Sequence, residues 1–169
     1  MFNIKKMIDD LIDILKIEIN KYEFLLITLK DEKKAIISNN ITKLIDNNEV
    51  KEILVRQIAE YEEKRKLILN KIALSHGLSN EELTVSKLSE YNDLSCSDRL
   101  NLCRSKLFYL IEKVTKANNL NKSLLNHSIE LVRGSISLLN NLIASESVYY
   151  ETGMVKSRGK SGRVISQEA

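Results

Sequence analysis

Two glutamates are the first residues of this chain whose type and spacing suggest chemistry. Glu18 and Glu32 lie fourteen residues apart on the apolar stripe of one predicted helix. That length of helix places them about 21 Å apart, and two carboxylates that share a reacting bond lie within about 10 Å of each other. We therefore expect no catalytic pair, but two side chains at the stripe's edge that pair with lysines of a neighbouring helix. Arg65, on the stripe of the next helix, is expected to reach a carboxylate or water.

The remaining candidates for chemistry are two cysteines and two histidines. Cys96 and Cys103 are seven residues apart, which is about 10 Å along a helix and too far for a disulfide. They are expected to be reduced thiols that pack as small apolar groups. His76 and His127 have no metal-ligand spacing. With no nucleophile–base set and no phosphate loop, we predict a protein that is not an enzyme and binds neither metal nor cofactor.

The elements that hold these residues are predicted to be long helices. The chain has 169 residues, no proline, 43% apolar residues and 29% charged residues, a composition that favours uninterrupted helices. We predict an all-α fold: an elongated antiparallel hairpin or bundle with coiled-coil-like packing, a short connecting helix and a flexible C-terminal tail. The predicted helical domain is 1–147 and the basic tail is 148–169. The predicted helices cover about 3–38, 40–76, 79–91 and 97–147.

Short polar segments mark the ends of these helices. Ser38-Asn39-Asn40 is expected to form a tight connection, with Asn40 capping the second helix. Gly77 is typical of the residue that follows a helix. Ser79 and Glu82 have the spacing of a capping box, which predicts the start of the short connecting helix.

The final helix carries the longest apolar seam of the chain, and three of its seam positions are polar. Asn121, Ser128 and Ser135 occupy these positions, and Gly134 lies beside them. A buried polar seam residue can fix register or oligomeric state, and a helical glycine permits a bend or close approach. The leucines beyond Leu120 either complete an intramolecular core or form an exposed stripe that binds a partner. The candidate partner-binding residues are Leu124, Leu125, Leu131, Leu138, Leu139 and Leu142.

Charge and hydropathy exclude several function classes. The formal net charge is +3, too small to favour nucleic acid strongly, and no stretch is long and apolar enough to span a membrane. Asp9, Asp10 and Asp13 interrupt the apolar run that a signal peptide needs. We therefore expect a cytoplasmic protein with no membrane insertion and no nucleic-acid partner.

The C-terminal half carries a recognisable pattern. It consists of Asn118 and Asn121, the pair Leu124-Leu125, a leucine-rich helix, Tyr149 with Gly153 four residues later, and a Gly/Lys/Arg/Ser tail. This pattern resembles the FlgN-type flagellar export chaperones. The hairpin has similar residues where that family favours them, so the resemblance covers essentially the whole chain. The hairpin positions are Glu18, Tyr22, Leu25, Glu32, Leu44, Lys51, Leu54 and Arg65.

The resemblance implies a cytoplasmic chaperone for type III protein export in flagellum biogenesis. Such a chaperone binds hook-filament junction proteins through their C-terminal helix, prevents premature assembly and delivers them to the export gate. The cytoplasmic domain of that gate is the second implied partner, with Tyr149, Tyr150 and Gly153 as docking residues. Tyr150 departs from the family, because relatives often have glycine there.

Two other functions are consistent with the residues. The seam can pair with itself, giving a self-associating coiled-coil structural or adaptor protein, and a weak homodimer fits either interpretation. The basic tail can also bind nucleic acid, although four basic residues without a folded basic surface give that function little support.

Overall fold

The computed structural model describes residues 4–75 and 94–145, which form three α-helices. They are α1 (Ile4–Ile37), α2 (Ile41–Ser75) and α4 (Leu94–Ser145). These residues contain no strand, so the prediction of an all-α chain of long packed helices is confirmed. The predicted helix over 79–91, the Gly77 and Ser79 signals and the boundary at 147 lie outside the described residues. The chain divides into two units, Met1–Lys122 and Ser123–Ala169, which are described separately below.

A three-residue connection turns the chain from α1 into α2. Asn39 has a φ of 49°, a left-handed conformation that asparagine tolerates better than most residues. The Asn40 amide donates to the Ala35 carbonyl (2.9 Å) and the Asn39 amide to the Ile36 carbonyl (3.1 Å), the two bonds of a Schellman motif. Asn40 then caps α2, because its Oδ1 accepts from the Lys43 amide at 3.0 Å. The capping prediction is confirmed.

Replacing the Asn40 side chain tests this connection. Asn40→Ala is expected to lower the free energy of unfolding by about 1 kcal/mol, because the Lys43 amide loses its acceptor. Asn39→Gly is the matched control in the same turn, and should change stability little because glycine adopts the same φ. Urea denaturation of both variants measures the difference, and equal stabilities would contradict the assigned cap.

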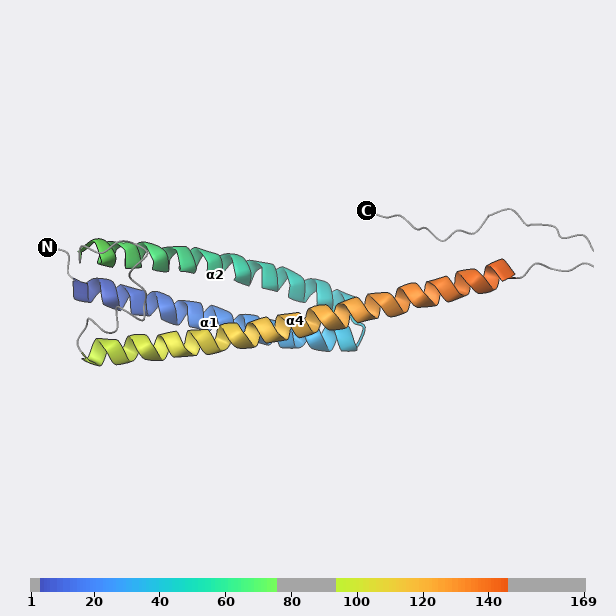
Figure 1. Cartoon of the computed structure of the whole chain (residues 1–169), viewed down its shortest axis with the longest axis horizontal. Helices are drawn as coiled ribbons and strands as arrows, with labels where there is room; N and C mark the ends of the chain where they lie inside the picture. Colours follow the sequence, from blue (N-terminus) through green and yellow to red (C-terminus); the bar gives the residue numbers. More distant parts are fainter. Residues whose placement is uncertain (1–3, 76–93, 146–169) are drawn as a thin grey trace, which may run out of the picture. The chain divides into compact units, whose positions relative to one another are not determined.

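Within Met1–Lys122, α1 lies between α2 and α4 (Figure 1). The helix α2 runs antiparallel to α1, and α4 runs parallel to α1. One core cluster joins Leu11 and Leu15 of α1 to Ile72 of α2 and Leu100 of α4. A second cluster is built on Leu25, Leu29, Leu54 and Ile58, with Val114 and Ala117 of α4 packed against it. The central helix α1 thus contributes to both clusters.

Two exposed ion pairs connect α4 to α1. The Arg99 guanidinium lies 3.1 Å from the Asp9 carboxylate, and the Lys106 ammonium lies 2.8 Å from Glu23. Exposed pairs contribute little to stability, typically less than about 1 kcal/mol. Both residues of the second pair follow those of the first along their helices, which agrees with the parallel direction of α1 and α4.

Candidate functional site

The two glutamates of α1 are structural, and their predicted placement is partly wrong. Glu18 is fully buried and Glu32 nearly so, although both were expected at the edge of the stripe. The Arg65 Nε donates to Glu18 at 3.0 Å, so the Glu18 partner is an arginine instead of a lysine, whereas the Lys51 ammonium lies 2.6 Å from Glu32 as predicted. The reason is the hairpin register: Arg65 and Lys51 are also fourteen residues apart, so each cation of α2 meets one carboxylate of α1.

Burial changes the acid–base properties around Glu18. Desolvation raises the pKa of the Glu18 carboxyl, and Arg65 acts in the opposite direction. Its second oxygen, Oε2, has no hydrogen-bond partner among the described residues. Beside it, the Tyr22 hydroxyl donates to Glu62 at 3.1 Å, and burial with this contact raises the pKa of Tyr22 to about 12. Tyr22 is therefore a neutral hydrogen-bond donor at neutral pH.

Asn121 ties α4 to the hairpin near the end of the first unit. Its amide nitrogen donates to the Leu29 carbonyl at 2.7 Å and to Glu32 Oε2 at 2.8 Å, and the side chain is almost completely buried. Since Glu32 also accepts from Lys51, one carboxylate joins all three helices. Asn121 therefore fixes the register of α4 in the way that buried polar seam residues do.

Asn121→Ala is expected to lower the free energy of unfolding by about 2 kcal/mol. The substitution leaves a buried oxygen of Glu32 without a donor, and an unsatisfied buried group is destabilising by about 1–3 kcal/mol. Asn118→Ala, at an exposed position one turn away on α4, is the control and should be nearly neutral. Chemical denaturation compares the two, and similar stabilities would contradict the role given to Asn121.

The remaining candidates for chemistry form no catalytic or metal site in the described residues. Cys103 is buried and Cys96 half-buried, both as free thiols. Burial raises the pKa of the Cys103 thiol, so it is neutral and poorly nucleophilic. Residues 4–75 and 94–145 contain no group of three or more His, Cys, Asp or Glu that can hold a metal ion. No helix in these ranges is both long enough and apolar enough to cross a membrane.

The six leucines predicted to bind a partner belong to the last part of α4. Leu124 is half-buried, and the other five are exposed. Leu131, for example, is 60% exposed and Leu138 is 66% exposed. Exposure of this degree disfavours the alternative that these leucines complete an intramolecular core. Leu124, Leu131, Leu138 and Leu142 follow one another at helical spacing, so they share one face of the helix.

A second apolar strip runs beside these leucines, and the sequence interpretation missed most of it. Exposed isoleucines and valine recur at steps of four and three residues, the spacing of one helix face. Together the two strips form an apolar arc over about half of the helix circumference. The sequence signal for this strip is isoleucine and valine at the same helical spacing, whereas the prediction included only leucines. The second strip comprises Leu125, Ile129, Val132, Ile136, Leu139 and Ile143.

The polar seam residues beyond Asn121 do not disrupt this apolar arc. Ser128 donates to the Leu124 carbonyl and Ser135 to the Leu131 carbonyl, both at 2.9 Å. Because these hydroxyls are satisfied by the helix itself, an apolar partner can cover them without stranding a polar group. Gly134 has open space around the position of a Cβ, and α4 continues through it without interruption.

Tyr149, Tyr150 and Gly153, the predicted gate-docking residues, lie outside the described residues. Their role stays a prediction from the resemblance.

Comparison with known proteins identifies the family. No curated protein and no solved structure matches the chain. The family described as FlgN protein matches residues 7–157, which include all three described helices except the first three residues of α1. This is the family that the sequence resembles, and the match confirms that the chain is a non-enzymatic chaperone. The chain belongs to the FlgN protein family, the flagellar export chaperones of the hook-associated proteins.

Proposed function

We propose that the apolar arc of α4 is the surface on which this chaperone binds its hook-associated cargo. The occupant is the C-terminal amphipathic helix of the cargo, which lies along Leu124–Ile143 with its apolar face toward the arc. The observation that supports this proposal is the exposure of both strips of the arc over some twenty residues of helix. A pair of amphipathic helices is a common means of covering such a surface.

Helix pairing of this kind explains how a chaperone can hold a cargo and still release it. Burial of about 1,000 Å² of apolar surface gives a gross term of about 25 kcal/mol. Association and ordering offset most of that gain, so the net affinity is set by the fit and not by area alone. While the cargo helix is covered it cannot pair with other subunits, which prevents premature assembly in the cytoplasm.

The second part of the proposal is delivery to the export gate. Tyr149, Tyr150 and Gly153, together with the basic residues that follow, dock on the cytoplasmic domain of the gate. The tail carries four basic residues against two acidic ones, which suits a weak contact with an acidic surface.

Truncation after Ser147 should abolish binding to the gate domain while cargo binding is retained. Loss of both activities together would contradict separate sites.

Calorimetry with a synthetic C-terminal helix of a hook-associated protein tests the cargo site. We expect saturable one-to-one binding with a negative heat-capacity change, the signature of apolar burial. A peptide of the same composition in scrambled order, which lacks a continuous apolar face, is the control and should not bind. Absence of binding by the native-sequence peptide would overturn the proposal.

Self-association is the alternative use of the same arc. Leu124–Ile143 of two copies can pair, because a helix end with an apolar arc on one side is self-complementary. Sedimentation of the full chain over a range of concentrations separates the cases. A weak dimer that cargo peptide dissociates fits the chaperone proposal, whereas a tight dimer that ignores the peptide favours a structural coiled coil.

A further inference from the structure

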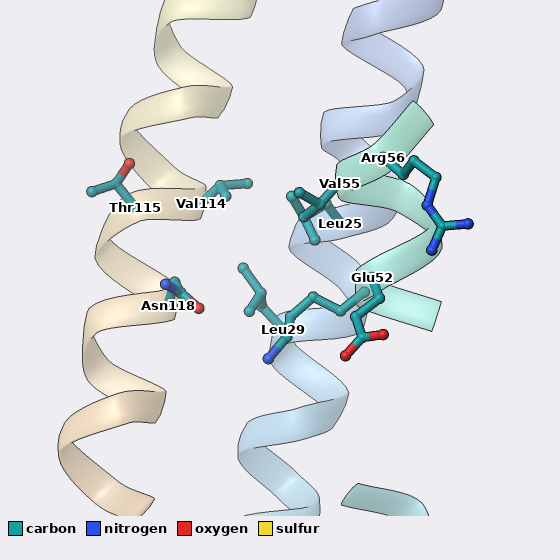
Figure 2. Close-up of a pocket in the computed structure, with 9 residues that line it drawn as sticks. Leu25, Leu29, Glu52, Val55, Arg56, Val114, Thr115 and Asn118 are labelled. Atoms are coloured by element: carbon teal, nitrogen blue, oxygen red, sulfur yellow. The ribbon is translucent and has the colours of Figure 1, made fainter. Parts of the chain in front are cut away.

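An open groove lies between α2 and α4 within Met1–Lys122, and no role has been assigned to it. Its volume is about 560 Å³. Leu25 and Leu29 of α1 line it together with Val55 of α2 and Val114 of α4. Figure 2 shows Val114 facing Leu25 and Val55 across the groove. The apolar side chains thus come from all three helices and face a common space.

One face of α4 continues the wall of this groove. Thr115 and Asn118 line the groove, and residues at helical spacing before and after them share their face of the helix. Two of these are large and apolar: Phe108 is 71% exposed and Ile111 is 39% exposed. This face, here called the α4 wall, comprises Arg104, Phe108, Ile111, Thr115, Asn118 and Lys122. The apolar surface therefore extends over more than one helical turn beyond the groove.

Charge along the α4 wall is positive, although the three α4 residues that line the groove itself are uncharged. Its residues from Leu94 to Lys122 include six basic side chains and only two acidic ones. Three of the six are in ion pairs, with Asp9, Glu23 and Glu112. Arg104 and Lys122, at the two ends of the α4 wall, are in no ion pair among the described residues. The α4 wall itself contains no acidic residue.

The α2 side of the groove is close to neutral. Lys51 is engaged by Glu32, and Glu52 accepts a hydrogen bond from Asn48 at 3.0 Å. Arg56 extends away from α4 (Figure 2). A helix bound in the groove would therefore meet apolar side chains at its centre and positive charge along its α4 side.

The last part of α4 and the tail of the chain do not complement this surface. The stretch Leu124–Ile143, which bears the apolar arc, has one acidic and one basic residue, Glu130 and Arg133, and the residues from Val148 onward carry an excess of positive charge. Neither supplies the negative charge that the α4 wall favours. We propose that the groove is a second docking site, separate from the cargo site, for an amphipathic helix of a partner protein with acidic residues flanking its apolar face.

Two synthetic peptides of about 20 residues, long enough to form a helix, test this proposal with the full-length chain. Both carry leucines at helical spacing; one has glutamates on the flanks and the other has lysines. We expect the glutamate peptide to bind at least about tenfold more tightly in fluorescence anisotropy, and to weaken as salt is raised. Equal affinities would show that positive charge at the groove plays no part and would overturn the proposal.

Matched variants locate the binding. Val55→Asn removes an apolar residue of α2 that lines the groove. Ile53→Asn is its control, because the Ile53 side chain is equally exposed (52%) on the same helix but does not line the groove. We expect Val55→Asn to weaken the glutamate peptide at least about fivefold and Ile53→Asn less than about twofold. Circular dichroism confirms that both variants fold. Equal effects would overturn the assignment of the site.

A charge exchange provides the decisive comparison. Arg104→Glu is expected to weaken the glutamate peptide and to strengthen the lysine peptide, because it reverses the charge at one end of the α4 wall. Lys113→Glu is the control on the same helix, at a residue whose ammonium lies over the Tyr109 ring at 5.2 Å and outside the α4 wall. If Leu131→Glu abolished peptide binding and Arg104→Glu did not, the peptide would occupy the apolar arc and the groove proposal would be wrong. That result would leave the cargo-site proposal standing, so the two proposals are tested separately.

Discussion

Replacing Leu131 and Leu138 together by glutamate is expected to weaken cargo binding by at least about 100-fold. Both side chains are well exposed in the free chain, so they are available to be covered when a cargo helix binds. Each buried leucine contributes about 1.5–3 kcal/mol, and a carboxylate buried without a partner is destabilising in addition. A 100-fold loss corresponds to only about 2.7 kcal/mol, so this expectation is conservative. Calorimetry with the cargo helix measures it.

The control for this variant changes the same charge on the same helix. Asn126→Glu with Asn140→Glu places two carboxylates on exposed polar positions of α4, outside the two apolar strips. This variant should bind cargo with less than about threefold loss, and both variants should unfold at the wild-type urea midpoint, because neither alters the core of Met1–Lys122. Equal binding by the two variants would contradict the placement of cargo on the arc.

Arg65→Met is the substitution with the largest expected effect on stability. Methionine keeps most of the packing volume of the arginine stem, but it leaves the fully buried Glu18 carboxylate without its cation. Removal of one partner of a buried pair is destabilising by about 3–5 kcal/mol. We expect a loss of about 3 kcal/mol at pH 7 in chemical denaturation. Arg56→Met, an exposed arginine on the same helix, is the control and should be nearly neutral.

The pH dependence of this loss identifies its cause. The folded-state pKa of Glu18 is already raised, so its contribution to stability is fully present below the unfolded pKa of about 4.3 and is lost as pH rises through the folded pKa. Arg65 lowers the folded-state pKa of Glu18, so the Arg65→Met substitution raises that pKa further. The destabilisation by Arg65→Met should therefore shrink as pH falls from 7 toward 5. A loss that is constant over this range would show that packing, and not the Glu18 charge, is responsible.

The sequence was sufficient to predict much of the fold. Long helices followed from the absence of proline and from apolar residues at steps of three and four. The turn followed from the asparagines before α2, and the lysine partner of Glu32 from charge pairing. These features follow from short-range sequence patterns or from the packing of one apolar stripe against another, and such patterns can be recognised directly in a sequence.

Other features depend on the register between helices, which the apolar stripe of a single helix does not reveal. Glu18 was expected at the edge of the stripe, but it is buried and paired with Arg65. Glu18 and Glu32 on α1 have the same separation of fourteen residues as Lys51 and Arg65 on the antiparallel α2, so both pairs form in one register. The hydrogen bond from Asn121 to Glu32 joins residues 89 apart in the chain, and no local pattern reveals that contact. Ile129, Val132 and Ile136 at helical spacing indicate the second strip in the sequence, but the predicted partner-binding set contained only leucines.

The site residues of this chaperone are known from the sequence only as candidates, and their exposure in α4 supports the cargo proposal. Hydrogen exchange of the full-length chain, with and without a cargo helix, tests that proposal most directly, because it reports the location of binding residue by residue. We predict protection on cargo addition over Ser123–Ser145, with exchange in α1 and α2 unchanged. Protection confined to α1 and α2, or no protection at a saturating cargo concentration, would contradict the account.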